Sequence, residues 1–204
     1  MTGAQYHTLN PCEVCVDPRE ASARLGMPFD FNQEPVRRCM EELQSVVAYR
    51  YAWRETKVRL LPDDRCDLGF AEVKSHALSR NLHGCESAVI LGVTTGMGVD
   101  RMLARQGLLN AGDAFICDAL ASAAAEALRE TAQSRVLGAR QHRPPFSPGY
   151  GDLSLDLQPA LLNFLNAGVT LGITLSASFL MKPVKSITAI IGVIHDTDFT
   201  AHPQ

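Results

Sequence analysis

Two β-branched apolar runs, far apart in the chain, constrain the fold most strongly. Residues 88–95 read Ala-Val-Ile-Leu-Gly-Val-Thr-Thr, and residues 186–194 read Ser-Ile-Thr-Ala-Ile-Ile-Gly-Val-Ile. Runs of this kind are typical of strands that are buried in a sheet. Helical segments and loops lie between them, without a regular alternation of strand and helix. This arrangement favours an α+β fold over an α/β fold.

Helical periodicity marks several of the other segments. Apolar residues recur at helical spacing over residues 34–52, and the pattern also predicts helices over 98–108 and 112–136. The last of these is rich in alanine, and its small side chains would let another element pack closely against it. Shorter elements are expected as a helix starting near residue 18, helices over 75–83 and 155–166, and three strands or a bent hairpin set over 169–194.

Length and composition suit one globular domain. The chain has 204 residues, of which 46% are hydrophobic and 20% are charged. We therefore expect a single domain over residues 1–204. Within it, residues 1–17 are expected to form an irregular arm, since Pro11 and Pro18 bracket a cysteine pair there.

Charge and hydropathy argue against several classes of partner. The net charge is −3 and no basic stripe is present, so no nucleic-acid role is expected. The first residues lack the pattern of a signal peptide, and no uncharged apolar run approaches the roughly 18 residues of a membrane span. The six cysteines are mostly dispersed, which favours reduced thiols. We expect a cytoplasmic protein without a membrane partner.

A proline-rich loop after the alanine-rich helix is the strongest candidate site. It reads Arg-Pro-Pro-Phe-Ser-Pro-Gly-Tyr from Arg143 to Tyr150. Its prolines restrict the backbone, which lowers the entropy lost when the loop orders around a polar ligand. Gly149 permits a close approach of the backbone, and Tyr150 offers a ring for stacking. The alternative is a structural turn between two helices.

This loop and a later segment resemble the two halves of a ligand site in one family, the reactivation domain of cobalamin-dependent methionine synthase. In that family an Arg-x-x-x-Gly-Tyr loop lies next to a Ser-Phe-x-Met-x-Pro segment, and both belong to the S-adenosylmethionine site. Here the second segment reads Ser-Phe-Leu-Met-Lys-Pro over 178–183. The likeness covers about residues 75–195 and is greatest to short, stand-alone versions of the domain. It implies a twisted, mainly antiparallel sheet flanked by helices.

The resemblance also implies a set of S-adenosylmethionine-binding residues. In the family, the loop arginine lies five residues before the tyrosine and grips the methionine carboxylate. That position is Pro145 here, and Arg143 lies two residues earlier, a shift of about 6–7 Å that a long guanidinium side chain could span. The implied ligand residues are Arg143, Phe146, Ser147, Pro148, Gly149, Tyr150, Ser178 and Phe199.

The function implied by the resemblance is that of a stand-alone reactivation subunit. Such a subunit binds S-adenosylmethionine and supports reductive methylation of inactivated cob(II)alamin on a separate methionine synthase or corrinoid protein. A flavodoxin-type protein is the expected electron donor. Cobalt is the nucleophile, so the subunit supplies positioning and electrostatics rather than an acid or a base. The alternative is a non-catalytic docking module for a corrinoid protein that has lost S-adenosylmethionine binding.

A third hypothesis concerns Cys12 and Cys15, which form a Cys-x-x-Cys pair. Such a pair can serve a metal site or a redox dithiol, but zinc would require two further ligands and no second pair exists. The segment Gly92–Gly98 matches neither the P-loop nor the dinucleotide-binding pattern. No Ser–His–Asp set or carboxylate pair supports hydrolase chemistry.

Overall fold

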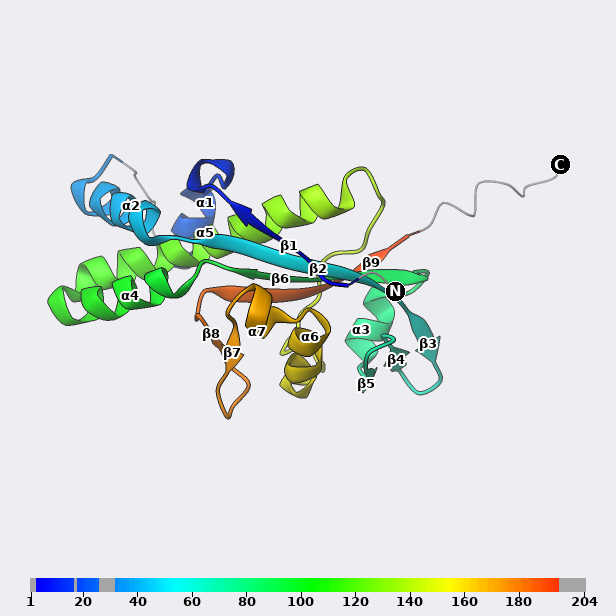
Figure 1. Ribbon diagram of the computed structural model, residues 1–204. Helices are drawn as coiled ribbons and strands as arrows, with labels where there is room; N and C mark the ends of the chain where they lie inside the picture. Colours follow the sequence, from blue (N-terminus) through cyan, green and yellow to red (C-terminus); the bar gives the residue numbers. More distant parts are fainter. Residues whose placement is uncertain (1–2, 17, 26–31, 195–204) are drawn as a thin grey trace.

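A four-stranded antiparallel sheet forms the centre of the computed structural model, which describes residues 3–16, 18–25 and 32–194 (Figure 1). The two apolar runs lie side by side in it and pair from Ser87↔Val193 to Thr94↔Ser186. Every pairing in this sheet is antiparallel, which confirms the predicted α+β class. The strand order is β1 (Gln5–Leu9), β2 (Tyr49–Lys57), β6 (Ser87–Thr94) and β9 (Ser186–Val193).

Four helices cover one face of this sheet (Figure 1). They are α1 (Pro18–Leu25), α2 (Glu34–Val46), α4 (Met97–Leu109) and α5 (Ala111–Leu137). Helix α5 contacts the other three helices and the sheet. Its fully buried Ala121 and Ala124 allow this crowding, because small side chains let neighbouring elements approach.

Helices α2 and α4 meet at Gly98. A Cβ atom at this position would lie 2.3 Å from the carbonyl oxygen of Val46, at the end of α2. Only glycine permits this contact between the two backbones.

Shorter elements cover the opposite face. They are the small sheet β3 (Arg59–Leu61), β4 (Arg65–Asp67) and β5 (Glu72–Lys74), the helices α3 (His76–Asn81), α6 (Gln158–Phe164) and α7 (Ala167–Thr170), and the hairpin β7 (Thr174–Leu175) and β8 (Met181–Lys182). A separate hydrophobic core lies on each face of the sheet, so strand β6 is buried on both faces. Val89 and Leu91 contact the core under the long helices, whereas Ala88 and Ile90 contact the core under the shorter elements. This explains why its sequence is continuously apolar.

Two expectations near the N-terminus differ from the structure. Residues 5–9, predicted as part of an irregular arm, form β1, because β2 offers them backbone hydrogen bonds that no local pattern reveals. The helix predicted over 34–52 ends at Val46, and β2 follows, because Tyr49 and Tyr51 alternate into the core. No described helix combines the length and apolar character that a membrane span requires.

Candidate functional site

The proline loop lies along the outer side of the edge strand β9. The backbone N–H of Arg143 donates to the carbonyl of Gly192 at 2.8 Å. Phe146 and Ile190 exchange two backbone hydrogen bonds of 2.9 and 2.7 Å. The loop thus covers one end of the edge like a short extra strand. Backbone N–H and C=O groups alternate in direction along an antiparallel strand. The backbone groups of the even-numbered residues of β9 are therefore directed towards the loop.

Beyond the loop, the edge of β9 is open at Thr188. The hydroxyl of Ser147 donates to the Thr188 carbonyl at 2.6 Å. The same alternation directs the Thr188 N–H outward, where no acceptor among the described residues takes its hydrogen bond. The buried side-chain amide of Gln158 donates to Thr188 Oγ1 at 2.9 Å, which fixes the Thr188 side chain against α6.

A groove of about 210 Å³ lies at this open end of the edge. Ser147, Pro148 and Tyr150 of the proline loop line it, together with residues 179–181 and 186–188 of the later segment. The fold therefore brings together the two sequence segments that carry the resemblance. Of the predicted ligand residues, these three are the ones that line the groove, and their contact with a ligand stays a prediction.

Two further predicted residues support the wall of this groove from within the loop. The ring of Phe146 meets the ring of Tyr150 edge-on, with centroids 6.3 Å apart. Gly149 has a φ of 90°, a conformation that favours glycine, and its N–H donates to the Leu153 carbonyl at 2.8 Å. The side chain of Tyr150 is 58% exposed, so its ring remains available to a ligand.

The remaining predicted residues lie elsewhere. The Ser178 hydroxyl is exposed and lies 3.0 Å from that of Ser176, outside the groove lining. Phe199 lies outside the described residues. Arg143 is turned towards the other end of β9, where its Nη2 donates to the carbonyl of His83 at 2.6 Å. Its side chain also packs against Gly192, so it anchors the loop to the turn after α3.

Sequence reasoning missed Glu126, whose carboxylate from α5 also lines the groove. Its Oε2 accepts a hydrogen bond from Arg129 Nε at 2.9 Å, and 27% of its side chain is exposed. The described lining contains no Lys or Arg. Glu126 is the charged side chain of the described lining, and its ion pair with Arg129 partly neutralises it. A carboxylate that interrupts a run of alanines is the signal that could have identified it.

Asp152 fixes the downstream end of the loop to the start of α3. Its carboxylate accepts hydrogen bonds from the Ser75 hydroxyl at 2.5 Å and from the backbone N–H groups of His76 and Ala77 at 2.7 and 3.1 Å. These bonds, that of Ser75 above all, lower the pKa of Asp152 to about 2. The loop is thereby held at both ends.

The cysteine pair is separate from this groove. Cys12 and Cys15 are exposed and free, on either side of Val14, which is buried against the core under the long helices. No group of three or more His, Cys, Asp and Glu side chains suited to a metal ion occurs among the described residues.

Comparisons with known proteins agree with this architecture. No family model matches the chain, and no curated protein matches it. Among solved structures, the chain is similar to the crystal structure of the MetH reactivation domain bound to AdoHcy, with a TM-score of 0.69 and 14% identity. The match covers 98% of this chain and 81% of that chain. The chain therefore has the fold of a methionine synthase reactivation domain.

Proposed function

We propose that this chain binds S-adenosylmethionine in the groove beside Tyr150. We further propose that it acts as a stand-alone reactivation subunit, which supports reductive methylation of cob(II)alamin on a separate methionine synthase or corrinoid protein. The observation that carries the proposal is the meeting of the proline loop with residues 179–188 in one groove. The solved structure with this fold was crystallised with AdoHcy, which supports the ligand class.

The groove offers complementary groups to an adenosine. The exposed ring of Tyr150 provides a face on which a purine can stack. The outward N–H of Thr188 provides a hydrogen-bond donor beside it. Because the proline loop is held on both sides, little conformational entropy is lost when the ligand binds.

Glu126 suits the charged part of the same ligand. S-adenosylmethionine carries a sulfonium and an ammonium group, and a carboxylate in the groove wall attracts both. The demethylated product keeps only the ammonium group. The carboxylate therefore attracts the methyl donor more than its product, and the ion pair of Glu126 with Arg129 reduces the difference.

The size of the groove fits a ligand that is only partly covered. Its volume of about 210 Å³ is below the roughly 300–1,000 Å³ of most small-molecule sites. Part of the ligand would remain accessible from outside, as methyl transfer to a second protein requires. The corrinoid of that protein would supply the nucleophile after one-electron reduction by a flavodoxin-type donor. This chain would contribute position and electrostatics.

A docking module that has lost S-adenosylmethionine binding is the second candidate. It is favoured by the position of Arg143, whose guanidinium is engaged with the His83 carbonyl, and by the lack of Lys and Arg in the described lining. Without such a cation, the methionine carboxylate has no charged partner in the described part of the groove.

Isothermal titration of S-adenosylmethionine distinguishes the two candidates. We expect saturable binding in the micromolar range, weakened at least tenfold by Tyr150→Ala. Tyr6→Ala is the matched control, because Tyr6 is similarly exposed but lies on β1, away from the groove. Absence of binding at millimolar ligand would exclude the first candidate. The docking candidate then predicts a stable complex with a corrinoid protein in size-exclusion chromatography.

A further inference from the structure

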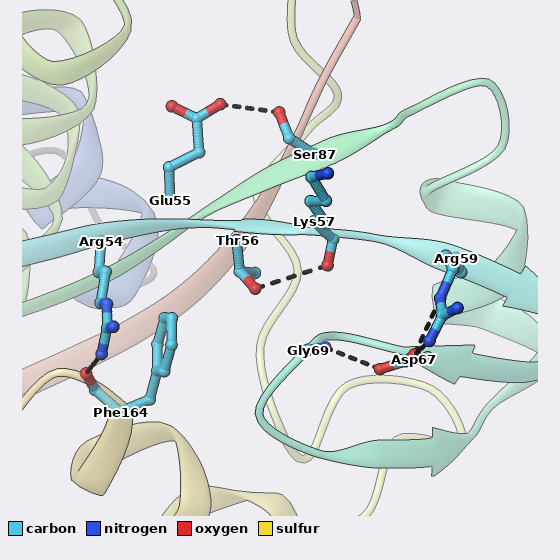
Figure 2. Close-up of a pocket in the computed structure, with 9 residues that line it drawn as sticks. All are labelled: Arg54, Glu55, Thr56, Lys57, Arg59, Asp67, Gly69, Ser87 and Phe164. Atoms are coloured by element: carbon cyan, nitrogen blue, oxygen red, sulfur yellow. Dashed lines mark hydrogen bonds and ion pairs between the residues drawn. The ribbon is translucent and has the colours of Figure 1, made fainter. Parts of the chain in front are cut away.

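A second groove, of about 680 Å³, lies beside the far half of β2. Figure 2 shows Arg54 and Phe164 on one side of it, Arg59 and Asp67 on the other, and Thr56 of β2 between them. Among the described residues, it shares no lining residue with the groove beside the proline loop. Its volume lies within the roughly 300–1,000 Å³ that small-molecule sites occupy.

One wall of this second groove is flat and fixed. The guanidinium of Arg54 lies over the ring of Phe164, 4.3 Å from its centroid, and donates to the Phe164 carbonyl at 3.4 Å. The ring of Phe164 also stacks against the ring of Phe70, with centroids 4.4 Å apart and an angle of 19° between the ring planes. Planar ligands stack on surfaces of this kind, which combine an aromatic ring with a guanidinium plane.

The acidic side chains of the second groove are already engaged. Glu55 accepts hydrogen bonds from the Ser87 hydroxyl at 2.7 Å and from Arg140 Nη1 at 3.0 Å. Asp67 forms an ion pair with Arg59. Their charges are therefore largely neutralised by partners that the structure already provides.

Two cationic side chains of the second groove, Arg54 and Lys57, are not neutralised by a carboxylate among the described residues. No described carboxylate forms an ion pair with Arg54 or Lys57. Figure 2 shows Arg54 extending from one face of β2, towards Phe164, and Lys57 from the opposite face, and both line the groove. The net charge available to a ligand is consequently positive. This favours an anionic ligand.

We propose that the second groove binds a planar aromatic anion. The ring of the ligand stacks on the guanidinium of Arg54, which lies over Phe164. Its carboxylate, sulfonate or phosphate lies at the part of the groove that Lys57 lines, on the other side of β2. The proposal does not depend on S-adenosylmethionine binding, because the two grooves are separate.

The probe is 8-anilinonaphthalene-1-sulfonate, a planar aromatic anion whose fluorescence rises on binding. We expect one saturable site on the native protein, with affinity reduced at least fivefold by Arg54→Gln and by Lys57→Gln. Lys57 is exposed, so its substitution leaves the fold intact. Lys74→Gln is the charge-matched control, because Lys74 is also exposed but does not line this groove.

Two further comparisons separate the second groove from other sites. The uncharged analogue N-phenyl-1-naphthylamine should bind more weakly and should not respond to Lys57→Gln. Tyr150→Ala should leave binding of the anionic probe unchanged, whatever it does to S-adenosylmethionine. Lack of saturable probe binding, or probe affinity that neither Arg54→Gln nor Lys57→Gln alters, would overturn the proposal.

Discussion

Arg143 Nη2 donates a hydrogen bond to the carbonyl of His83 at 2.6 Å, which directs the guanidinium away from the groove beside Tyr150. The contact lies near the opposite end of β9 from Thr188, since the Arg143 backbone pairs with Gly192. The arginine nearest to the family motif thus holds the loop in place. Where such an arginine lies in the sequence does not establish where its side chain points.

Arg143→Ala should therefore lower stability and spare ligand affinity. The lost hydrogen bond and packing should reduce the free energy of unfolding by about 1–2 kcal/mol. The dissociation constant for S-adenosylmethionine should change by less than about threefold, whereas Tyr150→Ala should show the reverse pattern. Urea unfolding and calorimetric titration of both variants provide the measurement. An affinity loss without a stability loss would instead assign Arg143 to the ligand.

Glu126→Gln should weaken S-adenosylmethionine binding by about threefold, because a carboxylate already paired with Arg129 contributes about 0.2–1 kcal/mol to a second charged contact. Binding of AdoHcy should weaken less, since it lacks the sulfonium. Glu130→Gln is the control, because Glu130 pairs with the same Arg129 yet does not line the groove. An equal loss of affinity for both ligands would show that Glu126 does not interact with the sulfonium.

Asp152→Asn should change the acid stability of the protein. The pKa of Asp152 is lowered from 3.8 to about 2 in the folded state, so its contribution is fully present above about pH 4 and is lost as the pH falls towards 2. The variant should melt at a lower temperature above pH 4, and its melting temperature should fall less steeply below it. Thermal unfolding from pH 2 to 6 tests this. Asp156→Asn, in the same segment but not bonded to α3, should retain the wild-type slope.

Gly98→Ala should destabilise the protein by several kcal/mol, because the new methyl group would meet the Val46 carbonyl oxygen at 2.3 Å. Gly107→Ala is the matched control in the same helix, because nothing lies within 4 Å of a Cβ atom there. That variant should be stabilised by up to about 1 kcal/mol. Chemical denaturation measures both, and similar effects at the two positions would contradict the close contact of α2 and α4.

The sequence predicted elements whose pattern is local. The strand expected over 88–95 is β6 (Ser87–Thr94), and the helix expected over 112–136 is α5 (Ala111–Leu137). Both contain long, consistent patterns of apolar or small residues, so their type does not depend on a distant partner. Strand β1 (Gln5–Leu9) is different, because four of its five residues are exposed and its strand conformation comes from pairing with β2.

Some features of the candidate groove were likewise predictable from local sequence, and others were not. The sequence by itself determined the proline loop and the segment after Ser178, because restricted backbones and a motif can be recognised without a structure. Only the tertiary structure decided that Glu126 joins them, that Arg143 points away, and that no described acceptor takes the hydrogen bond of the Thr188 N–H. These features depend on backbone hydrogen bonds and packing between residues far apart in the chain, which no local pattern encodes.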